Sequence, residues 1–159
     1  MDKLTHFNDS GRARMVDVGA KDKTDREATA RAVVFLNAET YARVRDGGMK
    51  KGDVLAVAQV AGIMAAKRTS DVIPMCHPIM LTGCDIDFVL DDAAATIEIT
   101  ATTRCNGETG VEMEALTAAS VAALTVYDMC KAAQRDIRIG ELRLLRKRGG
   151  KSGEYVYEG

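Results

Sequence analysis

The sequence predicts one α+β domain, because long apolar helices and alternating strands occur together in a short chain. Residues 53–68 and 110–135 are apolar on nearly every side, which is typical of buried helices. Residues 80–92 and 93–105 alternate apolar and polar positions, which is typical of antiparallel strands with one buried face. A chain of 159 residues, 47% of them hydrophobic, can build one sizeable core but hardly two.

The N-terminal part combines a polar arm with a strand and a short helix. Residues 1–28 are dense in Asp, Lys, Arg and Thr, and only Met15–Val18 resembles a strand. We therefore expect an extended arm ahead of a single domain at residues 29–159. Apolar and β-branched residues predict a strand at Arg31–Glu39, and a helix follows from about Ala38 to Asp46, where two glycines end it.

Two prolines keep residues 72–80 out of regular structure and hold His77 in a stiff segment. This is the only histidine outside the arm, and both a structural and a functional role stay open for it. Farther along, residues 106–110 predict a turn, residues 136–148 a last strand, and residues 149–159 a short extension.

The predicted order of elements is strand, two helices, two strands, helix and strand. Packing the helices on one face of a mainly antiparallel, four-stranded sheet gives an α+β sandwich that resembles the ferredoxin-like group. Helices that are apolar all round exceed what one face of such a sheet can cover. We therefore also expect a homo-oligomer.

Charge and cysteine usage exclude several kinds of partner. With 22 basic and 23 acidic residues, the chain has no net field that would attract nucleic acid or an anionic membrane. No apolar run reaches the length of a membrane span, and the N-terminus lacks the pattern of a signal peptide. The 4 cysteines form no C-x-x-C pair, which favours reduced thiols in the cytoplasm over disulfides or a metal site.

A glycine-rich segment at Gly149–Ser152 has the lysine and serine of a phosphate-binding loop but not the loop itself. That motif requires a glycine where this chain has Leu145, and it requires a helix after the serine. We therefore exclude a P-loop. Lys147 and Lys151 add positive charge either to a local anion site or to a solvated tail.

The helix at residues 110–135 carries ionisable side chains at both ends. Glu112 and Glu114 lie in its first turn, and Asp128 and Lys131 stand three positions apart near its end. Such a pair is either a plain ion pair or a catalytic one, and the expected burial of the helix favours catalysis. At about 1.5 Å per residue, Glu114 and Asp128 are roughly 21 Å apart. If both ends are functional, a second copy of the chain completes the site.

Further cations make proton transfer on a polyanionic substrate the chemistry that we favour. Lys51 precedes the helix at residues 53–68, where an ammonium group suits phosphate binding at the helix N-terminus. Lys67 and Arg68 close that helix, where the helix dipole alone would also favour them. Lysines, a histidine and carboxylates together supply cations for phosphate and an acid and a base. The candidate set is Lys51, His77, Glu112, Glu114, Asp128 and Lys131, with Lys67, Arg68, Arg104 and Lys147 in support.

The chain resembles the molybdenum cofactor biosynthesis protein C family in two stretches, KKGDVLAVAQVAGIMAAKRTSDVIPMCHPI and GVEMEALTAASVAALTVYDMCKA. The likeness runs from about Met15 to Tyr157. It implies a lyase that converts 3′,8-cyclo-7,8-dihydroguanosine 5′-triphosphate to cyclic pyranopterin monophosphate and releases pyrophosphate by general acid/base catalysis. It also implies a ferredoxin-like protomer and a hexamer, built as a trimer of dimers, with active sites at the dimer interface.

The resemblance further implies a role for each site residue. Asp128 is expected to be the active-site carboxylate, and Lys51 and Lys131 the general acid/base lysines. To lose a proton at neutral pH, these lysines need a pKa lowered by burial or by neighbouring cations. The residues expected to bind substrate are Met75, Cys76, Glu112, Met113, Glu114 and Lys147, together with His77, Lys67 and Arg68 near the triphosphate.

The resemblance implies no redox cofactor and no metal ligands, and the sequence leaves open whether Mg²⁺ accompanies the triphosphate. A competing hypothesis is a non-catalytic oligomer that clamps a nucleoside triphosphate with the same cations. In that case Asp128 and Lys131 form a structural ion pair. Turnover of the small-molecule substrate distinguishes the two hypotheses.

Overall fold

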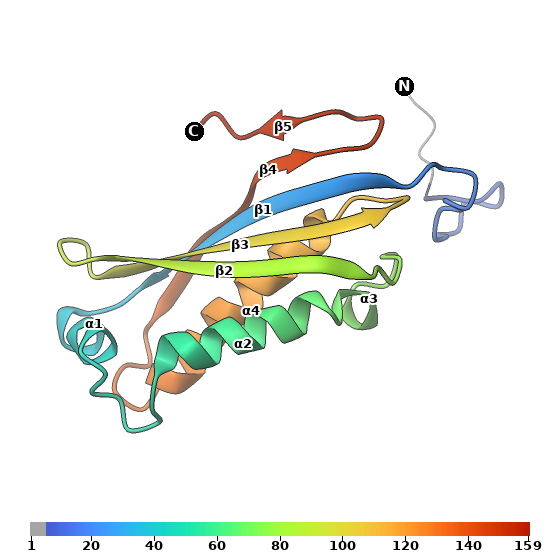
Figure 1. Cartoon of the computed structure of the whole chain (residues 1–159). Coiled ribbons are helices and arrows are strands. Elements are labelled where there is room, and N and C mark those ends of the chain that lie inside the picture. The colour runs from blue at the N-terminus through green and yellow to red at the C-terminus, as the bar shows by residue number, and fades with distance from the viewer. Residues whose placement is uncertain (1–5) are drawn as a thin grey trace.

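A computed structural model describes residues 6–159 and has the expected α+β architecture (Figure 1). The sheet order is β2-β3-β1-β4-β5, and each neighbouring pair of strands is antiparallel. Helices α2 and α4 lie side by side on one face of the sheet. The strands are β1 (Thr24–Phe35), β2 (Leu81–Asp91), β3 (Thr96–Gly107), β4 (Arg138–Arg148) and β5 (Tyr155–Val156), and the helices are α1 (Ala38–Arg45), α2 (Val54–Ala66), α3 (Thr69–Val72) and α4 (Glu112–Cys130).

The prediction of four strands is wrong, because the sheet has a fifth strand. Strand β5 is 2 residues long and pairs with Arg146 and Lys147 at the edge of the sheet. A strand this short leaves no alternation to detect, so the sequence indicated only a short extension there.

Strand β1 also begins earlier than predicted, at Thr24 rather than Arg31. Its first residues are polar or small, and β3 pairs with β1 over its whole length, so pairing with a neighbour overrides their weak strand propensity. Met15–Val18, which resembled a strand, has no regular structure. Residues 1–5 of the predicted arm lie outside the described residues, and the division at residue 28 stays a prediction.

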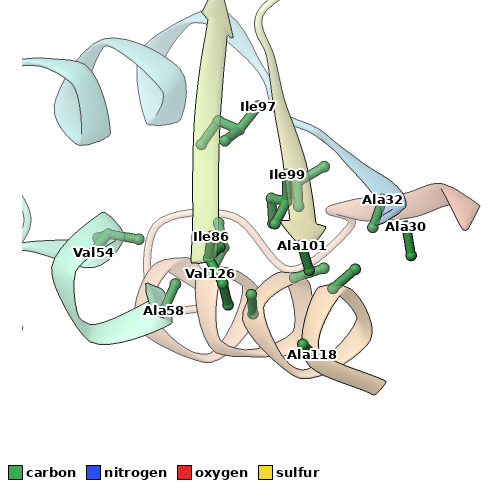
Figure 2. Close-up of a cluster of buried hydrophobic side chains, with 14 of the residues drawn as sticks. Ala30, Ala32, Val54, Ala58, Ile86, Ile97, Ile99, Ala101, Ala118 and Val126 are labelled. Atoms are coloured by element: carbon green, nitrogen blue, oxygen red, sulfur yellow. The ribbon is translucent and has the colours of Figure 1, made fainter. Parts of the chain in front are cut away.

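The core lies between the sheet and the paired helices (Figure 2). Alternation along β3 points Ile97, Ile99 and Ala101 at α4, and each is fully buried. Helices α2 and α4 approach closely at Gly62, where a Cβ atom would stand 2.2 Å from Ile86 Cδ1 and 3.0 Å from the Ala118 carbonyl oxygen. The small residues of both helices therefore allow two apolar helices to pack on one sheet face.

Part of the apolar helix surface stays uncovered in the single chain. Val57, Val60 and Met64 on α2 and Leu124 on α4 are all exposed, and each is a large hydrophobic residue. A group of exposed apolar side chains on one helix is typical of a surface that associates with another chain. Among the described residues, no helix combines the length and the hydropathy that crossing a membrane requires.

The proline-containing segment is irregular, as predicted, from Ile73 to Met80. It is preceded by the unpredicted short helix α3, which starts at Thr69 directly after α2. The Thr69 hydroxyl is buried and donates a hydrogen bond to the Ala66 carbonyl oxygen at 3.1 Å. This contact turns the chain at the end of α2, so that residues 73–80 run back toward the start of α4.

Candidate active site

Helix α4 holds the predicted site residues in two separate groups. It is one continuous helix of 19 residues from Glu112 to Cys130. At about 1.5 Å rise per residue, Glu114 and Asp128 are roughly 21 Å apart along its axis. The predicted separation of the two ends is therefore confirmed for a single chain.

At the C-terminal end of α4, one carboxylate binds two ammonium groups. Lys131 Nζ lies 2.6 Å from Asp128 Oδ1, and Lys51 Nζ lies 3.0 Å from Asp128 Oδ2. Lys51 Nζ also donates to the Asp128 backbone carbonyl at 2.9 Å. We call Lys51, Asp128 and Lys131 the lysine–aspartate cluster, and it places two proton donors on either side of one acceptor.

Solvent reaches the lysine–aspartate cluster more than the sequence indicated. The side chains of Asp128 and Lys131 are 56% and 52% exposed, so the expected burial is wrong for this pair in the single chain. Hydrogen bonds from Lys131 and then Lys51 lower the pKa of Asp128. The Asp128 carboxylate in turn raises the pKa of Lys131, which is opposite to the expected direction. Lys131 is therefore held in its ammonium form by Asp128.

The N-terminus of α2 does not use Lys51 in the way that the sequence indicated. The Asp53 carboxylate caps this helix and accepts a hydrogen bond from the Ala56 backbone N–H at 3.0 Å. A phosphate at the same N–H groups would be repelled by Asp53, and Lys51 reaches toward Asp128 instead. Lys51 therefore belongs to the lysine–aspartate cluster rather than to an anion site at α2.

At the N-terminal end of α4, a cavity of about 250 Å³ brings together six predicted binding residues. We call it the ring cavity. Its wall comes from α4, from the proline-containing segment and from the N-terminal arm. The predicted residues that line it are Met75, Cys76, His77, Glu112, Met113 and Glu114, and the others include Val16, Val18, Lys21, Thr109 and Gly110.

Glu114 is the buried carboxyl group of the ring cavity and is only 3% exposed. Burial, with a smaller contribution from the charge of Glu112, raises the pKa of Glu114 to about 7. Burial and the nearby Glu114 charge also raise the pKa of the Cys76 thiol. The cavity therefore holds a neutral thiol and a carboxyl group that can be ionised or protonated near neutral pH.

The N-terminal arm closes one side of the ring cavity. His77 Nε2 lies 2.6 Å from the Val16 carbonyl oxygen, and this contact requires Nε2 to donate because a carbonyl can only accept. The arm residues Val16, Val18 and Lys21 were missed because a polar, irregular segment gives no pattern that distinguishes a cavity wall from a solvated tail.

A second cavity of about 480 Å³ adjoins the first, and its wall holds basic side chains together with the carboxylates of Asp22, Glu108 and Glu112. We call it the cationic cavity. Lys21, Glu112, Thr109 and Gly110 line both cavities, so the two lie next to each other. Its basic residues are Lys21, Arg26, Lys147 and Lys151, and Ser152 also contributes to its wall.

The two cations at the end of α2 line neither of these cavities. Lys67 and Arg68 are both exposed, and Lys67 is close enough to Cys84 on β2 to influence its thiol. Arg104 is on the opposite face of the sheet, where it pairs with Glu27 and Asp85. Substrate binding by Lys67 and Arg68 stays a prediction.

Residues 15–150 of the chain match the MoaC family. The chain belongs to the MoaC family. It is 60% identical over 158 residues to a protein of Heliobacterium modesticaldum, with 99% of each chain covered. It is 62% identical over 156 residues to a protein of Peptoclostridium acidaminophilum and 63% identical over 155 residues to one of Thermoanaerobacter sp., with 98% of each chain covered in both comparisons. These three relatives are named cyclic pyranopterin monophosphate synthase.

The MoaC segment includes both ends of α4 and most of the cationic cavity. It contains every predicted site residue from Lys51 to Lys147, and it also contains Lys21 and Arg26. Lys151 lies one residue beyond the matched segment. Among residues 6–159, no three His, Cys, Asp or Glu side chains gather in a way that could hold a metal ion.

The buried Glu114 predicts a pH-dependent stability. The folded chain, in which the pKa of Glu114 is raised to about 7 from an ordinary 4.5, binds this proton more tightly than the unfolded chain. The contribution of Glu114 to stability is therefore present at low pH and is lost as the pH rises from about 4.5 to about 7. Glu114→Gln should accordingly raise the free energy of unfolding at pH 8 by about 2 kcal/mol and change it little at pH 5. Urea unfolding at both pH values measures this, and equal effects at the two would contradict it.

Proposed function

We propose that this chain is a cyclic pyranopterin monophosphate synthase. As a lyase, it converts 3′,8-cyclo-7,8-dihydroguanosine 5′-triphosphate to cyclic pyranopterin monophosphate and releases pyrophosphate. Its membership of the MoaC family and the names of relatives that align over nearly the whole chain support this activity. The structural observation that most supports this activity is the lysine–aspartate cluster at one end of α4 together with the two neighbouring cavities at the other end.

The two cavities suit the two parts of the substrate. We assign the ring cavity to the purine that is rebuilt into the pterin, because it offers carboxyl, thiol and imidazole groups to a flat polar ring. We assign the cationic cavity to the phosphates, because its three lysines and Arg26 outnumber its three carboxylates and can donate to phosphate oxygens. This placement moves the expected triphosphate position from the end of α2 to the end of β4.

We assign proton transfer to the lysine–aspartate cluster. Lys131 carries the proton that we assign to the rearranging ring, and it can donate this proton once substrate breaks its contact with Asp128, because that contact raises the pKa of Lys131 and weakens it as an acid. Asp128 holds both lysines and can accept a proton once substrate displaces one of them. Closing the cyclic phosphate requires alignment of a hydroxyl with the α-phosphate and neutralisation of the pyrophosphate leaving group, for which no protein nucleophile is needed.

A single chain cannot bring these groups to one substrate, so we propose that two copies share each active site. The roughly 21 Å between Glu114 and Asp128 exceeds the reach of one ring system. The exposed apolar side chains of α2 and α4 support association. We propose a hexamer built as a trimer of dimers. A monodisperse monomer in analytical ultracentrifugation at micromolar concentration would contradict this assembly.

We also propose a ferredoxin-like protomer and a cytoplasmic location. The order β2-β3-β1-β4, with the long helices after β1 and after β3, supports the fold. Four cysteines that form no disulfide support a reducing compartment. We propose catalysis without a redox cofactor, and a rate measured with EDTA tests whether Mg²⁺ enters with the triphosphate.

Turnover tests the proposed activity directly. Purified chain is incubated with the enzymatically prepared cyclic dihydro-GTP, and pyrophosphate and the pterin product are followed by mass spectrometry. Both products should appear together with the wild-type chain and disappear with Lys51→Ala and with Lys131→Ala, while sedimentation shows an intact oligomer. Binding of the substrate without any conversion would instead favour a non-catalytic nucleotide-binding protein.

A further inference from the structure

Lys147 faces the cationic cavity just after a point where β4 contains an extra residue relative to β1. Along the pairing of β1 with β4, Ala28 is opposite Lys147 and Ala30 is opposite Leu144, so Leu145 has no partner of its own. Ala28 and Ala30 both point into the core. Leu144 and Lys147 therefore lie on the same face, although residues three apart in a regular strand lie on opposite faces. The β-bulge at Leu145 thus turns Lys147 toward the helices.

The contacts of Lys147 agree with this change of face. Its side chain is only 20% exposed, and its Nζ lies 3.5 Å from Glu112 Oε1 at the start of α4. It also hydrogen-bonds the Ser152 hydroxyl. A second register shift, between Arg31 and Val33, comes earlier in this pairing. With that shift kept and only the bulge at Leu145 removed, the same ammonium group would lie on the far face of the sheet.

Beyond the bulge, an ion pair on that far face fixes how the end of β4 lies against β1. Glu27 is directly opposite Arg148. Its carboxylate accepts from Arg148 Nε at 3.1 Å and from Arg148 Nη2 at 3.3 Å. It also accepts from Arg104 Nε at 2.8 Å on β3. At 14% exposure, Glu27 is well shielded from solvent and links three strands at the level of Lys147.

These contacts keep the Glu27 carboxyl group ionised at neutral pH. Arg104 in the first place, and Arg148 in addition, lower the pKa of Glu27. Arg148 follows Lys147 in the chain and points to the opposite face, so holding Arg148 also holds the backbone from which Lys147 projects.

We propose that Glu27 is a positioning residue, which acts with the Leu145 bulge to place Lys147 against the phosphate end of the substrate. The proposal rests on the proposed function, in which the cationic cavity takes the phosphates. Glu27 touches no cavity itself, since it is on the opposite face of the sheet. Its effect on substrate must therefore pass through a neighbouring residue that lines the cavity. Arg26, which precedes Glu27, is already held by the Gly107 and Glu108 carbonyl oxygens, so we assign the effect to Lys147.

A double-mutant cycle between Glu27→Gln and Lys147→Met tests this role. Each single substitution should raise the KM for substrate by about tenfold, the size expected for one misplaced charged hydrogen bond, and should leave kcat nearly unchanged. The double variant should be no worse than Lys147→Met alone, because Glu27 acts only through that lysine. Tripolyphosphate affinity, measured by calorimetry on the full oligomer, should follow the same non-additive pattern.

The matched control is Glu154→Gln, which removes another Arg–Glu pair from the same strand. Glu154 binds Arg146 at 3.0 Å, but both side chains are about half exposed. It should change neither KM nor tripolyphosphate affinity. If Glu27→Gln lowers the yield of folded oligomer, Arg148→Gln replaces it in the cycle, because Glu27 then keeps its bond to Arg104.

The outcomes separate this inference from the proposed function. Additive effects, or an unchanged KM in Glu27→Gln, would overturn the positioning role even when the wild-type chain turns over normally. A wild-type chain that binds tripolyphosphate but forms no pterin would overturn the proposed activity, and the calorimetric cycle would still decide the role of Glu27. A chain that neither binds tripolyphosphate nor turns over would overturn both.

Discussion

Asp128→Asn is expected to reduce turnover by about three orders of magnitude, within the range for loss of a group in acid/base catalysis. The amide keeps the size of the side chain but loses the charge that holds Lys51 and Lys131 at 3.0 and 2.6 Å. Both ammonium groups then repel each other and lose their common orientation. Pyrophosphate release in single-turnover kinetics measures the loss.

The fold should survive this substitution, because Asp128 is more than half exposed and exposed ion pairs contribute little to stability. The matched control is Glu39→Gln, which removes an exposed ion pair to Arg43 on α1. It should change neither turnover nor the thermal midpoint. Turnover of Asp128→Asn within threefold of wild type would contradict a catalytic role for the lysine–aspartate cluster.

Gly62→Val should lower the free energy of unfolding by about 3 kcal/mol, the upper part of the range for an overpacked core. A Cβ atom at this position would stand 3.0 Å from the Ala118 carbonyl oxygen, and that backbone atom belongs to the neighbouring helix. The Ile86 side chain, at 2.2 Å, can change rotamer, but α4 cannot retreat without opening the core. Urea unfolding followed by circular dichroism measures the change.

Ala56→Val is the control for Gly62→Val, because it adds the same branched side chain to an exposed position of α2. Its cost should be limited to the lower helix propensity of valine, about 0.5 kcal/mol. Equal destabilisation by both variants would mean that the approach of α2 to α4 at Gly62 does not explain the effect.

The sequence predicts those elements whose own residues carry a pattern. The alternation in β2 and β3 and the acidic start of α4 are local signals, and all three elements form where expected. The polar start of β1 and the short β5 depend on pairing with neighbours, which no local pattern reports. The same holds for the bulge at Leu145, because it is defined only relative to β1.

The residues of the candidate site also fall into those that a local pattern predicts and those whose role depends on distant parts of the chain. Asp128 and Lys131 are three apart on a helix, so their ion pair follows from helical geometry alone. The ring cavity could be assembled only with the help of the family resemblance, because its residues come from separate segments. Lys21 and Arg26 escaped notice because their role depends on how the arm and β1 meet the end of β4.

Subunit complementation tests the central claim, that each active site combines the two ends of α4 from different chains. Chains with Asp128→Asn and chains with His77→Ala, each inactive alone, are mixed, dissociated in mild urea and reassembled. Pyrophosphate release should return to about a quarter of the wild-type rate, because half of randomly paired dimers are mixed and one site in each mixed dimer carries neither substitution. No recovery, with mass spectrometry showing that mixed oligomers have formed, would contradict shared active sites.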